Sequence, residues 1–151
     1  MVSPIDYSAL TFLVVDDESV IVDLVHGLLQ SLGAKKVHKA VSAMTGLNML
    51  MDSNEKIDCI VSDHNMQPLT GLEFLRKIRV GRNPAMNRNV RFVMLTAHGD
   101  VEVVKSALAL DVDSYVIKPV TRGNLDKAII RAVTRKRILS AGSAYDAIPL
   151  P

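Results

Sequence analysis

Two kinds of hydrophobic pattern alternate along the chain. Short runs rich in β-branched and other apolar residues are typical of buried strands and occur at 11–15, 36–41, 57–62, 91–95 and 114–117. The segments between them repeat apolar residues at helical spacing, at about 19–32, 43–52, 71–80, 101–110 and 122–139. Because parallel strands need crossover connections, this order predicts a doubly wound α/β fold, in which helices cover both faces of a five-stranded parallel sheet.

The same pattern predicts one domain at 10–139 with an N-terminal tail at 1–9 and a C-terminal tail at 140–151. A length of 151 residues suits a single domain, and 48% hydrophobic and 23% charged residues are ordinary for a globular protein. The segment after residue 139 is too short for a DNA-binding or enzymatic domain. We therefore expect any output to depend on a separate protein.

Cysteine and histidine content excludes several classes of site. The single cysteine, Cys59, excludes an internal disulfide, and the four histidines lack zinc-ligand spacing. No basic stretch precedes the apolar run at 12–15, and no run of about 18 apolar residues occurs. We therefore expect a cytoplasmic protein without a signal peptide or membrane insertion.

The net charge of +2 is unevenly distributed, because basic residues concentrate at 118–137 with only Asp126 opposing them. A basic segment can bind nucleic acid. Here, however, no aromatic side chain interleaves with the charges to stack on bases. We therefore interpret the segment as a solvated helix face and expect no direct nucleic-acid partner.

Polar residues directly follow four of the predicted strands: Asp16 and Asp17, Asp63, Thr96, and Lys118. Any one of them could merely cap a turn or a helix. The carboxyl ends of parallel strands meet at one edge of a sheet, however, so these side chains should converge. Carboxylates about 4 Å apart repel by roughly 4 kcal/mol per pair at an effective dielectric near 20, which one lysine cannot offset for all three. Hard oxygen ligands favour Mg²⁺, and Mg²⁺ indicates phosphoryl chemistry.

At these residues the sequence resembles the receiver domain of two-component response regulators, the CheY-like family. The resemblance covers about residues 10 to 137, and its motifs are Asp16-Asp17, Asp63 with Gly71 eight residues on, Thr96-Ala97, and Tyr115-Val116-Ile117-Lys118-Pro119. It implies a flavodoxin-like strand order of 2-1-3-4-5.

The resemblance also implies a role for each acidic residue. Asp63 would accept a phosphoryl group from a sensor histidine kinase or a histidine phosphotransfer protein. Asp17 and Asp63, with Asp16 through water and the backbone carbonyl of Asn65, would hold Mg²⁺, for which Mn²⁺ could substitute. The protein would be a signalling phosphoacceptor rather than an enzyme, with self-phosphorylation from small donors and autodephosphorylation.

By the same resemblance, Thr96 and Lys118 would bind the phosphoryl oxygens, and the Lys118-Pro119 peptide bond is a candidate cis bond. Thr96 moving inward would let Tyr115 rotate, and this switch would change the face formed by the fourth helix, fifth strand and fifth helix. That face would control a downstream target, and the protein would be a monomer or a phosphorylation-dependent dimer.

Three positions depart from or refine the family pattern. Proline at position 68 lies one residue later than is common, which can alter the loop shape. Asn65 and His98 each lie two residues beyond a site residue, at positions that tune hydrolysis of the phosphoryl group in the family. These positions leave the lifetime of the phosphorylated state open.

Two alternatives use similar sheets. A haloacid dehalogenase-like, Mg²⁺-dependent phosphatase also has an aspartate nucleophile, but its Asp-x-Asp signature differs from the Asp16-Asp17-Glu18-Ser19 found here. A flavin mononucleotide binder would need a Ser/Thr/Gly-rich loop after the first strand, where this chain has acidic residues. Turnover of a phosphomonoester or a flavin spectrum would reveal either one.

Overall fold

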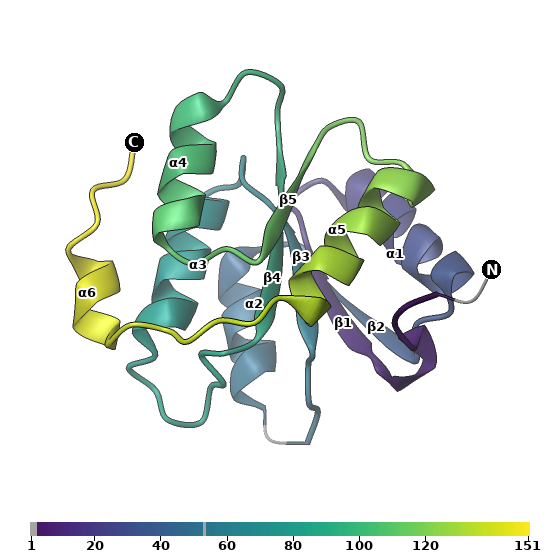
Figure 1. Cartoon of the computed structure of the whole chain (residues 1–151), viewed down its shortest axis with the longest axis horizontal. Coiled ribbons are helices and arrows are strands. Elements are labelled where there is room, and N and C mark those ends of the chain that lie inside the picture. The colour runs from purple at the N-terminus through teal and green to yellow at the C-terminus, as the bar shows by residue number, and fades with distance from the viewer. Residues whose placement is uncertain (1–2, 53) are drawn as a thin grey trace.

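A five-stranded parallel sheet forms the centre of the protein in a computed structural model that describes residues 3–52 and 54–151 (Figure 1). Its strands lie in the order β2-β1-β3-β4-β5, and every neighbouring pair is parallel. The strands are β1 (Thr11–Val15), β2 (Lys36–Ala40), β3 (Cys59–Asp63), β4 (Arg91–Thr96) and β5 (Ser114–Ile117). The predicted doubly wound fold and the strand order implied by the resemblance are both confirmed.

Helices cover both faces of the sheet (Figure 1). One face carries α2 (Ala43–Met51), α3 (Gly71–Val80) and α4 (Val101–Ala109), and the other carries α1 (Ser19–Leu32) and α5 (Arg122–Thr134). Every residue of β1 and β3 is buried, which explains the apolar runs at 12–15 and 59–61, whereas the edge strand β2 is mostly exposed or half-buried. Within the described ranges, no helix has the length and apolarity needed to span a membrane.

Local signals explain both boundaries of α3 (Gly71–Val80). In α3, the Thr70 side chain accepts from the backbone N–H of Glu73, while the Glu73 carboxylate accepts from the backbone N–H of Thr70. The helix ends at Gly81, whose φ of 64° lies in the left-handed region that glycine adopts without strain. The pattern of polar and apolar residues therefore predicts these boundaries well.

The two ends of the chain differ from the prediction. The helix predicted to reach residue 139 ends at Thr134, because Arg135 leaves the helix and its guanidinium binds Asp111 before β5. The segment interpreted as a C-terminal tail contains α6 (Gly142–Asp146), with Tyr145 buried in the cluster beside α3. In the segment interpreted as an N-terminal tail, Tyr7 is buried and its hydroxyl donates to Asp126 of α5 at 2.5 Å. Contacts between residues distant in sequence cause all three differences.

Candidate functional site

The carboxyl ends of the strands bring the predicted polar residues to one edge of the sheet, at the top of Figure 1. Asp16 and Asp17 directly follow β1, Asp63 ends β3, Thr96 ends β4, and Lys118 directly follows β5. Asp16, Asp63 and Thr96 are buried, whereas Asp17 is exposed. The parallel sheet thus collects at one edge residues that are far apart in the chain.

Asp63 and Lys118 form an ion pair in which Lys118 Nζ lies 2.7 Å from Asp63 Oδ1. The carboxylate is almost fully buried, whereas 32% of the lysine side chain is exposed. The backbone holds Lys118 in place, since its N–H donates to the Thr96 carbonyl oxygen at 2.8 Å. The Lys118-Pro119 peptide bond is cis. This pair places a nucleophilic oxygen beside a cation that can bind an incoming anion.

Asp16 lies at the end of β1 in an environment that disfavours its charge. Its Oδ1 accepts from the backbone N–H of Glu18 at 2.9 Å, whereas its buried Oδ2 has no hydrogen-bond partner among the described residues. Burial, opposed by the Glu18 N–H and reinforced by the charge of Asp63, raises the pKa of Asp16 to about 6. A buried carboxylate oxygen without a donor favours a bound cation.

A cluster of carboxylates surrounds this position. Oxygen atoms of Asp16, Asp17 and Glu18 lie within 4.8 Å of one another. Glu18, which directly follows the acidic pair, belongs to this cluster although the sequence analysis did not name it as a candidate ligand, whereas the ligands predicted beside Asp16 and Asp17 were Asp63 and the backbone carbonyl of Asn65. The ion pair with Lys118 accounts for one oxygen of Asp63. Hard oxygen donors and one unpaired buried oxygen fit Mg²⁺, which prefers carboxylates and water.

Thr96 carries the second unpaired polar group at this edge. Its Oγ1 is buried and makes no hydrogen bond to any described residue. Leaving a buried polar group unpaired typically costs about 1–3 kcal/mol, and such groups are rare in native proteins. The hydroxyl of Thr96 is therefore a buried donor whose hydrogen-bonding capacity no described residue uses.

Residues 12–130 match the sequence model of the response regulator receiver domain family, and this span includes Asp16, Asp63, Thr96 and Lys118. The chain belongs to this family. Its receiver domain is CheY-like in fold, and the polar edge of the sheet described above coincides with the motif residues that the sequence shares with the family.

Individual relatives agree with this membership. The chain is 29% identical over 123 residues to chemotaxis protein CheY-3 of Vibrio cholerae, covering 82% of this chain and 91% of that protein. It is 31% identical to chemotaxis protein CheY of Pseudomonas aeruginosa, covering 82% of this chain and 95% of that one. A solved structure of a receiver domain protein from Clostridium thermocellum has a TM-score of 0.72 and 32% identity, covering 82% of this chain and 94% of that one.

The receiver site argues against the phosphatase alternative. Lys118 pairs with Asp63 at the end of β3, and not with Asp16 or Asp17 after β1, where the haloacid dehalogenase signature would lie. Together with the match to the receiver family, this geometry favours a phosphoacceptor on β3.

Tyr115 lies beside the site rather than within it. On β5 it pairs with Met94, whereas Ile117 pairs with Thr96, so Tyr115 is two positions back along the strand. It is half-buried and lines a groove of about 330 Å³ with Lys127 of α5. Tyr115 therefore lies at a groove between β5 and α5, on the strand that pairs with the strand ending at Thr96.

The loops after Asp63 and Thr96 contain the two residues predicted to tune hydrolysis, Asn65 and His98, and also His64, to which the sequence analysis gave no role. Asn65 and His98 are exposed at the rim of the site, whereas His64 is half-buried and its burial lowers its pKa. Gly71 donates its N–H to the His64 carbonyl at 2.8 Å, and a Cβ on Gly71 would lie 2.4 Å from the Asp63 carbonyl oxygen. The fixed spacing of Gly71 after Asp63 is the sequence signal for this close contact.

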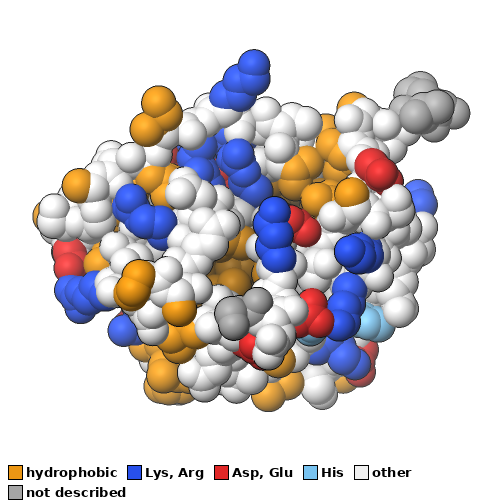
Figure 2. Space-filling model, turned by 90° about the horizontal axis from the view of Figure 1, so that it is seen from below, with side chains coloured by type: hydrophobic (Ala, Val, Ile, Leu, Met, Phe, Trp, Pro, Cys, Tyr) orange, Lys and Arg blue, Asp and Glu red, His pale blue; other side chains and the backbone are white. Residues whose placement is uncertain are grey.

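A second charged cluster, which the sequence did not reveal, lies at the opposite edge of the sheet. Asp113 accepts from Arg137 Nε at 2.7 Å and from Arg79 Nη2 and the backbone N–H of Phe92 at 2.9 Å. Arg91 Nη1 lies 3.3 Å from Asp113 Oδ1. Burial lowers the pKa of Arg79 to about 10, so it stays protonated at neutral pH. Figure 2, which views the molecule from this edge, shows several Lys and Arg side chains on the surface.

Proposed function

We propose that this receiver domain accepts a phosphoryl group on Asp63 from a sensor histidine kinase or a histidine phosphotransfer protein. The phosphorylated domain then controls a downstream target protein through its α4-β5-α5 face. The observation that carries this proposal is the buried Asp63 carboxylate held 2.7 Å from Lys118 beside two unpaired polar atoms, Asp16 Oδ2 and Thr96 Oγ1.

The transfer proceeds by attack of an Asp63 carboxylate oxygen on the phosphorus of a phosphohistidine. The new P–O bond forms as the P–N bond breaks, and the electron pair stays with the imidazole, which takes up a proton. The product is an acyl phosphate on Asp63. Lys118 then faces the added negative charge, and Thr96 donates its hydroxyl to a phosphoryl oxygen, which supplies the partner it lacks in the structure.

Magnesium is part of this proposal. Asp16, Asp17 and Asp63, with the backbone carbonyl of Asn65, would hold Mg²⁺ or its substitute Mn²⁺. The bound ion supplies charge neutralisation for the phosphoryl oxygens. The carboxylate cluster at the end of β1 and the unpaired oxygen of Asp16 support this choice of ligands.

The switch follows from the new hydrogen bond of Thr96. When Thr96 moves toward the phosphoryl group, it vacates space next to β5, and Tyr115 turns inward from the groove that it lines with α5. Asn65 and His98, exposed at the rim, are placed to tune hydrolysis of the acyl phosphate. The domain is thus a signalling phosphoacceptor that also takes phosphate from small donors and dephosphorylates itself.

Acetyl phosphate tests the proposal without a partner protein. With Mg²⁺, we expect a base-labile mass increase of about 80 Da on the peptide that contains Asp63, and none when EDTA replaces Mg²⁺. Circular dichroism confirms that the protein is folded in both samples. A folded protein that gains no adduct, or gains it on a different residue, would contradict the assignment of Asp63.

A further inference from the structure

The C-terminal segment is folded onto the receiver domain. α6 lies beside α3 in Figure 1, and Tyr145 is buried in the same apolar cluster as the core of α3. A Cβ on Gly142 would lie only 2.2 Å from the Val80 carbonyl oxygen, so the backbone of α6 touches the last residue of α3 directly. The segment is therefore an integral part of the described structure.

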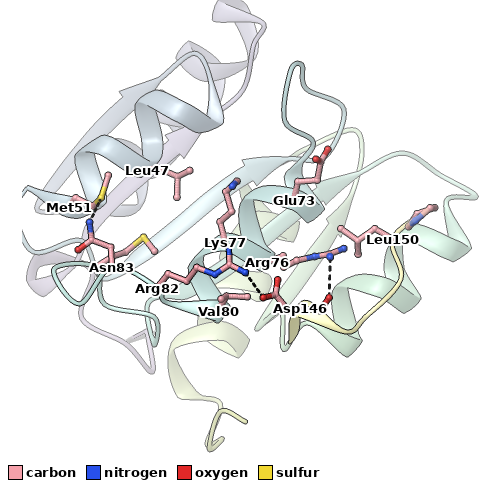
Figure 3. Close-up of a pocket in the computed structure, with 12 residues that line it drawn as sticks. Leu47, Met51, Glu73, Arg76, Lys77, Val80, Arg82, Asn83, Asp146 and Leu150 are labelled. Carbon is pink, nitrogen blue, oxygen red and sulfur yellow. Dashed lines mark hydrogen bonds and ion pairs between the residues drawn. The ribbon is translucent and has the colours of Figure 1, made fainter. Parts of the chain in front are cut away.

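Most polar contacts of α6 with α3 are exposed and therefore weak. α6 and the residues after it form one wall of a groove of about 620 Å³ whose other walls are α2 and α3 (Figure 3). Arg82 pairs with Asp146 at 2.5 Å, and Arg76 reaches the Asp146 carbonyl oxygen at 3.5 Å. Exposed ion pairs contribute about 0–1 kcal/mol. The buried side chain of Tyr145 is thus the main anchor of α6.

That anchor is attached to the connection between α4 and β5. The Tyr145 hydroxyl donates to Asp111 Oδ2 at 2.7 Å and accepts from the backbone N–H of Ser140 at 2.9 Å. Arg135, at the start of the same segment, reaches Asp111 Oδ1 at 3.2 Å and also donates to the Val112 carbonyl. Two parts of the C-terminal segment therefore hold one turn of backbone at the far end of α4.

Arg79 of α3 also donates to the Asp111 carbonyl oxygen, at 2.9 Å, but the helix that this turn follows buries few side chains of its own. Within α4 only Val103 and Ala107 are buried, whereas Val101 is 63% and Leu108 57% exposed. A short loop joins its first turn to Thr96, and its last turn leads to Asp111. A helix with so few buried side chains can shift as a unit, and its position depends on what holds its two ends.

We propose that residues 135–148 form a C-terminal clamp that holds α4 in the position described here and loosens when Asp63 is phosphorylated. This inference rests on the proposed function, because the movement of Thr96 toward the phosphoryl group is its trigger. Coupling between two sites is reciprocal. Phosphorylation must weaken the contact of Tyr145 with Asp111, and loss of that contact must favour phosphorylation.

Amide hydrogen exchange in the full chain measures the first half of this coupling. The Ser140 amide, bonded to the Tyr145 hydroxyl, and the Ile148 amide, bonded to the Tyr145 carbonyl, report directly on the clamp. With excess acetyl phosphate and Mg²⁺, we expect both to exchange at least about fivefold faster, while Ile60 in β3 stays unchanged. Intact mass is read on the same sample. Full phosphorylation with unchanged exchange would overturn the clamp alone, whereas a missing adduct would overturn the proposed function and the trigger with it.

A conservative variant tests the reverse effect, that of the contact between Tyr145 and Asp111 on the phosphorylation site. Tyr145→Phe keeps the buried ring and removes only the hydroxyl, so we expect beryllofluoride with Mg²⁺, a non-covalent mimic of the phosphoryl group, to bind about fivefold more tightly, toward the lower end of coupling between two sites. Ser143→Ala, at an exposed position of the same helix, is the matched control and should bind it as the unchanged protein does. A Kd for Tyr145→Phe equal to that of Ser143→Ala would overturn the proposal.

Discussion

The two edges of the sheet hold their buried aspartates in opposite ways. At the carboxyl edge, Asp16 has one bonded and one unpaired oxygen, and Asp63 has the single ion pair with Lys118. At the other edge, Asp113 receives donors from three arginines and a backbone N–H. Both edges bury carboxylates, so burial alone does not distinguish a functional site from a structural one.

The two edges differ in whether the oxygens of their buried carboxylates all accept hydrogen bonds or ion pairs. A buried charge is tolerated when it is paired and hydrogen-bonded, and it is costly otherwise. Asp113 is saturated and joins β4, β5, α3 and the C-terminal segment. Asp16 and Thr96 leave polar atoms unpaired at the place where a phosphoryl group and a cation would bind. Under the proposed function, ligands would pair with these atoms at the unsaturated edge, while the saturated edge joins separate elements of the domain.

The largest expected effect concerns the acceptor. Asp63→Asn removes the nucleophilic oxygen and should abolish phosphorylation by acetyl phosphate, with the fold intact by circular dichroism. Asp58→Asn, directly before the same strand, is the matched control and should still be phosphorylated. Persistent labelling of Asp63→Asn at the level of the unchanged protein would show that the acceptor lies elsewhere.

The next largest expected effect is the loss of stability when Asp113, the aspartate with a full set of donors, is replaced. Asp113→Asn keeps the shape but leaves the fully buried Arg79 without its counter-charge, so we expect a loss of about 3–5 kcal/mol in the free energy of unfolding by urea. Glu102→Gln, in an exposed pair with Lys105 at 3.9 Å, should change it by less than about 0.5 kcal/mol. Similar losses for both variants would show that the network around Asp113 contributes no special stability.

At the unsaturated edge, removal of a charge should instead stabilise the metal-free protein. The pKa of Asp16 is raised from 3.8 to about 6 on folding, so ionisation of this group opposes folding. The contribution of Asp16 to the free energy of unfolding is therefore most favourable below pH 3.8, where the carboxyl is protonated, and it is lost as the pH rises through 6. In EDTA at pH 7, Asp16→Asn should therefore raise the free energy of unfolding by about 1–3 kcal/mol, and the gain should vanish near pH 3.5. A gain independent of pH would contradict this cause.

The smallest expected effect is the difference in stability between removing an unpaired buried hydroxyl and removing a hydrogen-bonded one. Thr96→Val replaces an unpaired hydroxyl and should leave the free energy of unfolding unchanged or raise it by up to about 1 kcal/mol. Ser114 Oγ donates to the Ala128 carbonyl at 2.6 Å, so Ser114→Ala should lower it by about 1 kcal/mol. Equal destabilisation of both variants in urea would remove the distinction between the edges.

The sequence by itself determined the alternation of strands and helices, the parallel sheet and the convergence of Asp16, Asp63, Thr96 and Lys118. These features follow from the period of apolar residues and from the rule that parallel strands end at one edge. Capping residues likewise marked the ends of α3. Such signals are local, so they can be read without knowing which segments meet.

Tertiary structure alone decided which polar groups found partners. The end of α5 and the position of α6 depend on Arg135 and Tyr145 reaching Asp111, and these contacts span 24 and 34 positions of the chain. The raised pKa of Asp16 and the saturation of Asp113 depend in the same way on packing around them. The spacing of apolar residues shows which face of a helix or strand is buried, and it can be seen within one segment. The pairing of charges depends on which elements become neighbours, and this is decided only when the chain folds.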